Sequence, residues 1–289
     1  MKSTLTLIKR TFTAFGEDDC LSLAGALAFY TALSLAPLLV ILLRIASLLG
    51  EGAQQSFVGQ VQNVVGNQAG SAVKMIIDSA DQQPGWGSIA GIISLVILVF
   101  SASGVFAQLQ SSLNRIWEVE AKPSEGVWGW LRKRLLSVGM IVAVAFLLLV
   151  SLALSAGVGM VMPAKGVIWQ IVNMAVSLVV FVFLFAVMFK YLPDVKIKWR
   201  DIWTGAIVTA VLFAAGKFGI EIYLAHSSTA SAYGAAGSLL VLLLWVYYAS
   251  LLVFLGAEFT QVNARLSGSP IEPNEFAQWA VPHTKQMSV

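Results

Sequence analysis

The chain alternates long apolar stretches with short polar segments that hold most of its charges and prolines. A helix that crosses a bilayer needs about 20 consecutive, mainly apolar residues. Six stretches are of that kind: residues 21–49, 88–109, 135–161, 167–189, 202–223 and 238–262. The pattern therefore predicts an all-α membrane protein, a bundle of six transmembrane helices.

The segments outside these spans complete the predicted organisation. Residues 1–20 carry apolar positions at helical spacing beside Lys9 and Arg10, which predicts an amphipathic helix on the cytoplasmic surface. The first outer loop, residues 51–86, shows helical spacing twice and predicts two short helices. We expect three regions: the N-terminal segment (1–20), the transmembrane domain (21–265) and a flexible, proline-containing tail (266–289).

Positive charges predict the orientation of the spans. Fourteen Lys and Arg residues lie in the N-terminal segment, the second-to-third loop, the fourth-to-fifth loop and the tail, whereas the opposite side has only Lys74 and Lys165. Cytoplasmic loops of membrane proteins are enriched in Lys and Arg. Both termini are therefore expected in the cytoplasm.

Composition supports the membrane prediction and limits the chemistry. Hydrophobic residues make up 58% of the chain and charged residues 11%, against about 25% charged in a typical soluble domain. One cysteine, Cys20, permits no disulfide within the chain, and the two histidines, His226 and His283, lie far apart. We expect no metal site and no cofactor. The phosphate-binding motif GxxxxGK[ST] is missing from the sequence, which argues against direct use of ATP.

A nuclease is the enzyme class that we weighed, and the residues argue against it. Metal-dependent hydrolysis needs clustered His, Asp and Glu, but the largest acidic group, Glu17, Asp18 and Asp19, is contiguous and precedes a span. We interpret that group as solvated or paired with nearby cations. The sequence shows no basic surface with interleaved aromatic residues, so it predicts no nucleic-acid partner. The chain is therefore not expected to be an enzyme.

Ionisable residues within spans are the main candidates for function, because they are costly unless they face a cavity, a partner or the bundle interior. Lys217 and Glu221 are one helical turn apart on the fifth span. They form either a packing pair or part of an outward-opening polar cavity whose mouth includes His226. Arg44 is expected to snorkel at the outer interface, and Glu258 either pairs with a loop cation near the inner interface or joins the cavity.

Polar and aromatic residues add further candidates to this cavity. Pro37 is expected to kink the first span, and the resulting free carbonyls would lie near Tyr30 and Ser34. Trp245, within the sixth span, either packs in the bundle or lines the cavity. Six cations in the cytoplasmic loops are expected to anchor lipid headgroups: Arg132, Lys133, Arg134, Lys196, Lys198 and Arg200.

Several motifs resemble the YihY/virulence factor BrkB family, formerly grouped under the name ribonuclease BN. They are AFYTALSLAP (28–37), LNRIWEV (113–119), YLPDVKIKWRDIWTGA (191–206), YGAAGSLLVLLLWVYY (233–248) and LGAEF (255–259). The resemblance implies a six-spanning protein of the bacterial inner membrane with a role in virulence or the cell envelope. It implies no agreed biochemical activity.

Together these observations favour a transporter or flippase-like protein that moves a lipid, an amphiphile or a small polar solute. The expected partners are membrane lipids and such a substrate. A non-transporting scaffold for envelope assembly is the alternative, and it predicts that Lys217 and Glu221 are packed and dry. A ribonuclease is the third hypothesis, and it is disfavoured.

Overall fold

The computed structural model describes residues 4–47, 89–122, 167–226 and 237–280, and these are mostly helical. The helices are α1 (Thr4–Glu17), α2 (Cys20–Ser47), α4 (Ile89–Ile116), α6 (Val167–Tyr191), α7 (Trp199–His226) and α9 (Gly237–Leu266). The predominantly α-helical fold predicted from the sequence is confirmed.

The helix bounds follow the apolar stretches closely. Predicted spans 21–49, 88–109, 167–189, 202–223 and 238–262 correspond in order to α2, α4, α6, α7 and α9. The predicted amphipathic segment contains α1. The predicted span 135–161 and the short helices of the first outer loop lie outside the described residues.

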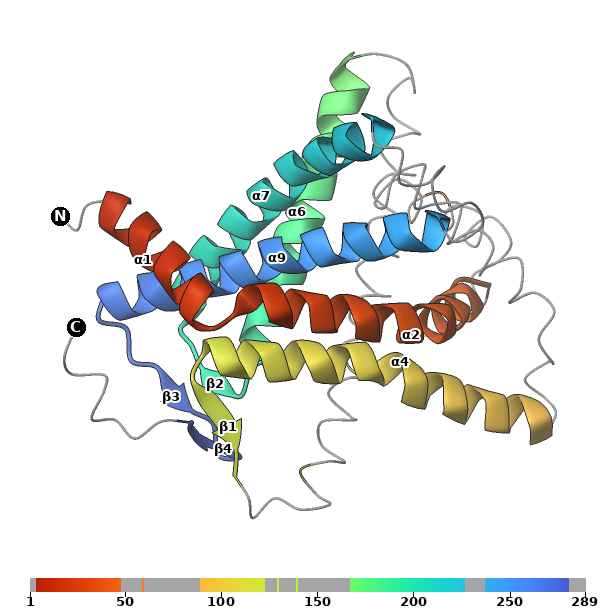
Figure 1. Ribbon diagram of the computed structural model, residues 1–289, viewed down its shortest axis with the longest axis horizontal. Coiled ribbons are helices and arrows are strands. Elements are labelled where there is room, and N and C mark those ends of the chain that lie inside the picture. Colours follow the sequence, from red (N-terminus) through yellow and green to blue (C-terminus); the bar gives the residue numbers. More distant parts are fainter. Residues whose placement is uncertain are drawn as a thin grey trace.

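The long helices pack in a row (Figure 1). α6 packs on α7, α7 on α9, α9 on α2, and α2 on α4, while α1 lies against α9. The first residues of α2 and α7 lie on the same side of the bundle as the last residues of α4, α6 and α9. Both ends of the described chain lie on this side too. We call this region the polar end of the bundle.

Two short strand pairs close the polar end. β1 (Val119–Ala121) pairs antiparallel with β4 (Ala277–Trp279), and β2 (Val195–Lys196) pairs antiparallel with β3 (Glu272–Pro273). The sequence predicted a flexible tail from residue 266, but these pairs bind its residues 272–279 to the segments after α4 and α6. The reason is that backbone pairing between distant segments satisfies donors and acceptors that a loose tail would leave to water.

Aromatic packing forms the centre of the row. The Phe213 ring of α7 lies 5.0 Å from Phe181 and 5.8 Å from Phe185 of α6. On its other side it meets Trp245 of α9 edge-to-face at 5.9 Å. Such edge-to-face pairs are favourable beyond the apolar area that they bury, so this cluster fixes α7 between its two neighbours.

The α7–α9 crossing is unusually close because glycine and threonine face each other twice. A Cβ atom at Gly205 of α7 would overlap the Thr260 hydroxyl of α9, and one at Gly256 of α9 would overlap the Thr209 hydroxyl of α7. Each threonine donates its hydroxyl to the glycine carbonyl four residues earlier on its own helix, at 2.7 Å for Thr209 and 2.6 Å for Thr260. Small residues at helix crossings let backbones approach in this way.

Apolar side chains also cover much of the outside of the row. Large hydrophobic residues are exposed on α2, α4, α6 and α7, including Phe29, Leu33, Phe100, Met174 and Val211. Within the described residues, two segments are long and apolar enough to cross a membrane by length and composition, Met174–Tyr191 and Leu240–Leu266. Only 22% and 39% of their respective windows are buried in the protein. A soluble core helix would be mostly buried, so this exterior suits lipid.

A charged candidate site at the polar end

The turn between α1 and α2 directs one carboxylate inward. Asp19 takes a left-handed backbone conformation with φ of 54°, which separates the two helices, and aspartate tolerates this region better than most residues. Glu17 and Asp19 are exposed, whereas Asp18 is partly buried against the bundle. The contiguous acidic group therefore does not behave as one solvated unit.

Glu258 is the buried acid at the centre of the site. Its side chain is fully buried on α9, Oε1 accepts a hydrogen bond from the Cys20 thiol at 3.5 Å, and Asp18 lies close enough to interact with it. Among the described residues, its second oxygen, Oε2, has no hydrogen-bond partner. A buried carboxylate oxygen without a partner is costly, which makes Glu258 a candidate functional residue.

The electrostatic surroundings of Asp18 oppose its ionisation. Burial raises the pKa of the Asp18 carboxyl above its usual value, and the negative charge of Glu118 acts in the same direction. Contact with Glu258 and the positive charges of Arg115 and Arg265 lower that pKa, but burial outweighs them. Asp18 is therefore closer to neutrality than an exposed aspartate.

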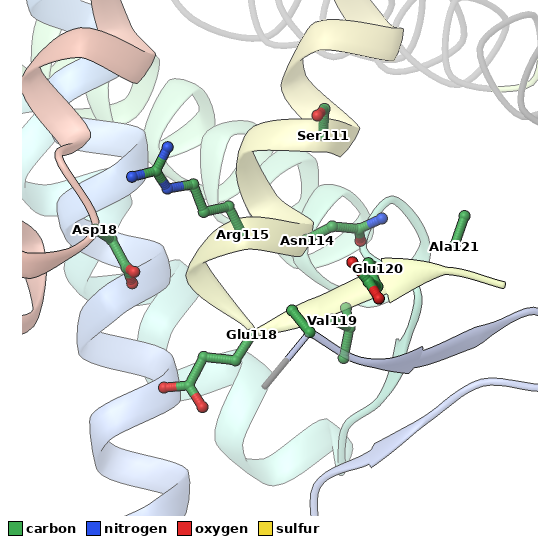
Figure 2. A pocket seen from close by; sticks show the side chains of 9 residues that line it. Asp18, Ser111, Asn114, Arg115, Glu118, Val119, Glu120 and Ala121 are labelled. Atoms are coloured by element: carbon green, nitrogen blue, oxygen red, sulfur yellow. The ribbon is translucent and has the colours of Figure 1, made fainter. Parts of the chain in front are cut away.

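A charged pocket of about 460 Å³ opens beside this acid pair. It lies between the α1–α2 turn, the last turn of α4 and strand β1, and its lining includes Asp18, Asn114, Arg115, Glu118 and Glu120. In Figure 2 Arg115 extends from α4 toward the turn that carries Asp18. Charges of both signs line the pocket together with Val119, Ala121 and Ala280, so it can hold water and polar or charged groups.

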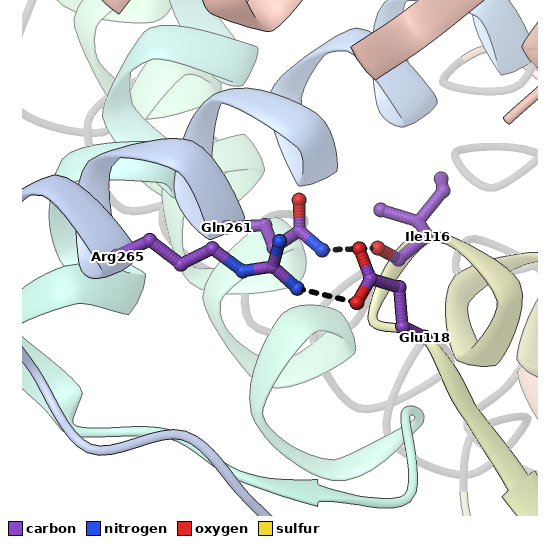
Figure 3. A network of polar contacts seen from close by, with 4 residues as sticks. All are labelled: Ile116, Glu118, Gln261 and Arg265. Carbon is purple, nitrogen blue, oxygen red and sulfur yellow. Dashed lines mark hydrogen bonds and ion pairs between the residues drawn. The ribbon is translucent and has the colours of Figure 1, made fainter. Parts of the chain in front are cut away.

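Contacts between α4 and α9 hold one wall of the pocket. Arg265 of α9 forms an ion pair with Glu118 at 2.9 Å, and Gln261, one turn earlier, donates to the Ile116 carbonyl at 2.6 Å (Figure 3). Glu118 has a positive φ of 56°, as a residue just past a helix end often does. Glu258, Gln261 and Arg265 recur at helical spacing, so one face of α9 supports the whole site.

A second buried carboxylate, Asp194, ties three segments together behind the pocket. Its Oδ2 accepts hydrogen bonds from Asn114 at 2.9 Å and Gln110 at 3.2 Å, both on α4. Its Oδ1 accepts from Asn274 of the tail at 2.9 Å, and its own backbone N–H donates to Asn114 Oδ1 at 2.7 Å. Only 2% of Asp194 is exposed. This network joins α4, the α6–α7 turn and the tail.

Some residues predicted to line a polar cavity take other roles. Ser34 is buried and donates to the Ser101 carbonyl at 2.8 Å, which links α2 to α4. Trp245 packs on Phe213, as the packing interpretation stated. Tyr30 is exposed and meets Phe29 edge-to-face. These side chains therefore do not gather around Glu258.

The hydrogen bond of Glu258 differs from the expected pairing with a loop cation. Within the described residues it receives that bond from Cys20, and its acidic neighbour is Asp18. Within the described part of the chain, Glu258 forms no ion pair with a cation, and the helix that begins at Cys20 packs against α9.

The other candidates lie partly outside the described side chains. α2 continues without interruption through Pro37 and Arg44, and α7 through Lys217, Glu221 and His226, but the side chains of these residues are outside the described part of the chain. The predicted kink and outer cavity therefore stay predictions. Of the predicted anchoring cations, Lys196, Lys198 and Arg200 are exposed at the polar end, and Arg132, Lys133 and Arg134 lie outside the described residues.

Sequence reasoning missed four residues of the candidate site: Asp18, Cys20, Arg115 and Asp194. The available signal was the set of motifs that carried the family resemblance. LNRIWEV supplies Arg115 and Glu118, YLPDVKIKW supplies Asp194, and LGAEF supplies Glu258. These motifs are distant in sequence, and their common location shows only in the fold.

A helical protein with an apolar exterior and a charged end is typical of integral membrane proteins, and comparison with known proteins agrees. The family model described as virulence factor BrkB matches residues 11–277. The chain therefore belongs to the virulence factor BrkB family.

Curated relatives are named UPF0761 membrane proteins. One from Methylibium petroleiphilum is 28% identical over 91% of this chain and 63% of its own length. One from Legionella pneumophila is 31% identical over 85% of this chain and 59% of its own length, and one from Stenotrophomonas maltophilia is 30% identical over 89% and 61%. The chain thus spans about three fifths of the length of these relatives. No solved structure matches it.

Proposed function

We propose that this integral membrane protein crosses the bacterial inner membrane six times and moves a lipid, an amphiphile or a small polar solute, with a role in the cell envelope. It acts by movement of the substrate rather than by chemical conversion, and it needs no cofactor. The observation that carries the proposal is the buried acid Glu258 within an apolar helix, joined through Asp18 to a charged pocket at the bundle end.

The energetic cost of this arrangement supports movement over a scaffold role. A static scaffold has no need for an acid with an unpartnered oxygen inside an apolar helix, whereas transport proteins use intramembrane acids to bind ions or substrates. The pocket offers charges of both signs beside that acid, so it can accept the charged head of an amphiphile or a polar solute. Lys217 and Glu221 on α7 would serve the opposite end of the same path.

The proposed orientation places the polar end in the cytoplasm. Segments with fourteen Lys and Arg residues lead to or from this end, in keeping with the charge bias of cytoplasmic loops. On α1, Leu5 is 75% and Phe12 60% exposed, beside exposed Lys9 and Arg10. Such a helix would lie on the inner leaflet with its apolar side chains among the lipids.

The proposal predicts lipid movement in a purified system. Full-length protein is placed in liposomes that contain a fluorescent phospholipid, and an impermeant quencher is added outside. We expect more fluorescence to be lost than the outer leaflet contains, because inner-leaflet lipid reaches the quencher. Glu258→Gln and Lys217→Ala are expected to slow this loss several-fold.

Glu272→Gln is the matched control, because Glu272 is exposed on β3 at the polar end and does not line the pocket. It should leave the rate of loss unchanged. If the wild type loses only the share of fluorescence that the outer leaflet contains, phospholipid movement is excluded and the result favours the scaffold alternative. If Glu258→Gln moves lipid as fast as the wild type, the buried acid is not part of the path.

A further inference from the structure

We infer that Asp18 and Glu258 form a proton-binding carboxyl pair, which exchanges its proton with water in the charged pocket. As a source of driving force for substrate movement this inference rests on the proposed function. As a proton site it stands on the burial, the hydrogen bonds and the pocket at the polar end, independently of what the protein moves.

The first argument is the hydrogen-bond pattern of Glu258. Oε1 already accepts the Cys20 thiol proton, and Oε2 is buried without a partner among the described residues. An ionised carboxylate would leave Oε2 as a desolvated charged acceptor, which is strongly unfavourable. A proton on Oε2 removes the charge and gives the side chain a donor, with Asp18 as the neighbouring acceptor.

The second argument is the proximity of two acids. Two carboxylates that interact within one partly buried site do not both ionise readily, and they share a proton instead. Asp18 and Glu258 come from different elements, the α1–α2 turn and α9, and the fold brings them together. Burial raises the pKa of Asp18, which agrees with a shared proton.

The charges around the pair favour one proton rather than two ionised acids. Among the described residues, the groups that face it from the packed elements are Cys20 of α2, Arg115 at the end of α4, Glu118 just after that helix, and Arg265 of α9. Arg265 is already paired with Glu118 at 2.9 Å and is 40% exposed, so its charge is largely compensated and screened. Arg115 is exposed and lines the pocket. Neither arginine supplies the direct partner that an ionised Glu258 would require.

The third argument is access. Asp18 belongs both to the lining of the pocket and to the surroundings of Glu258, which is itself fully buried. A proton from pocket water reaches Asp18 first and then passes to Glu258, and the reverse path releases it. The pair therefore connects the water at the polar end with the buried carboxyl group of Glu258 on α9.

Infrared spectroscopy of the full-length protein tests this inference. At neutral pH the carbonyl stretch of a protonated carboxylic acid is expected in the wild type and absent from Glu258→Gln. After transfer to D₂O this band should shift rapidly in the wild type. In Asp18→Asn the exchange should be at least about tenfold slower, because the titratable group between pocket and acid is gone.

Asp19→Asn is the matched control for Asp18→Asn. Asp19 is the exposed neighbour of Asp18 in the sequence, and Asn tolerates its left-handed backbone conformation. The infrared band and its rate of exchange should therefore not change in this variant. Cys20→Ala provides a second variant if Glu258→Gln folds poorly. It removes the thiol donor to Oε1 and should shift the frequency of the band without abolishing it.

Two results would overturn the inference: no protonated-acid band in the wild type at neutral pH, or a band that survives Glu258→Gln. Exchange that is unaffected by Asp18→Asn would remove Asp18 from the pair. The outcome is separable from the proposed function. A wild type with the band but without lipid movement keeps the proton site and excludes phospholipid movement. Lipid movement without the band supports the proposed function and removes the proton site.

Discussion

Gly205→Leu and Gly256→Leu should each prevent stable packing of α7 against α9. At both positions even a Cβ atom would overlap a threonine hydroxyl of the facing helix, so a leucine forces the two backbones apart. Overpacking of this kind typically costs about 1–3 kcal/mol, and more where the obstacle is a helix crossing. We expect the free energy of unfolding to fall by about 3 kcal/mol or more. The measurement is a large fall in the thermal unfolding temperature of the purified protein in detergent.

Gly219→Leu is the control on the same helix, because a Cβ atom there meets nothing within 4 Å. It should leave stability unchanged or raise it slightly, since leucine favours a helix by about 1 kcal/mol over glycine.

A milder pair of variants keeps the test informative if the leucine variants do not fold. Gly205→Ala should destabilise, and addition of Thr260→Ala should restore part of the loss. Equal effects at Gly205 and Gly219 would contradict the close crossing.

Asp194→Ala should produce the second large loss of stability, about 3 kcal/mol or more. The substitution leaves the amide groups of Gln110, Asn114 and Asn274 without their acceptor. Each buried donor that loses its partner costs about 1–3 kcal/mol. Thermal unfolding in detergent measures the effect, and proteolysis of the tail reports whether β3 and β4 detach.

Asp194→Asn separates the role of the acceptors from that of side-chain volume. Both oxygens of Asp194 accept hydrogen bonds, so an NH₂ group at either position would face another donor. This variant should therefore destabilise as well, although its size is unchanged. Glu272→Gln, on exposed β3, is the control and should have little effect. A wild-type unfolding temperature for Asp194→Asn would show that the network contributes little.

The helices were predictable from the sequence because each is a long apolar run that ends in charges or prolines. Bounds such as 238–262 for α9 fell within a turn or so of those observed, since a change in hydropathy is a local property. The close α7–α9 crossing is different. Small residues recur at four-residue spacing in several places on α7, among them Ala215–Gly219 and Gly205–Thr209. In the fold Ala215 and Gly219 are exposed, and only the partner helix decides which pair packs.

The candidate site was less predictable because its contacts join distant segments. Asp194 and Asn114 are separated by 80 positions, and Cys20 and Glu258 by 238. Asp18 appeared as one of three contiguous acids, and the turn at Asp19 that directs it inward has no sequence signature strong enough to predict. Strands of two or three residues, such as β2 and β4, are too short for any alternating pattern.

Proton-linked movement through the polar end is the central claim of this account, and a pH gradient across the liposome membrane tests it most directly. The fluorescent-phospholipid assay is run with wild type, Glu258→Gln and Glu272→Gln, with and without that gradient. We predict that the gradient changes the rate of movement in the wild type and in Glu272→Gln, but not in Glu258→Gln. A wild-type rate that ignores the gradient, or a Glu258→Gln rate that follows it, would contradict the claim.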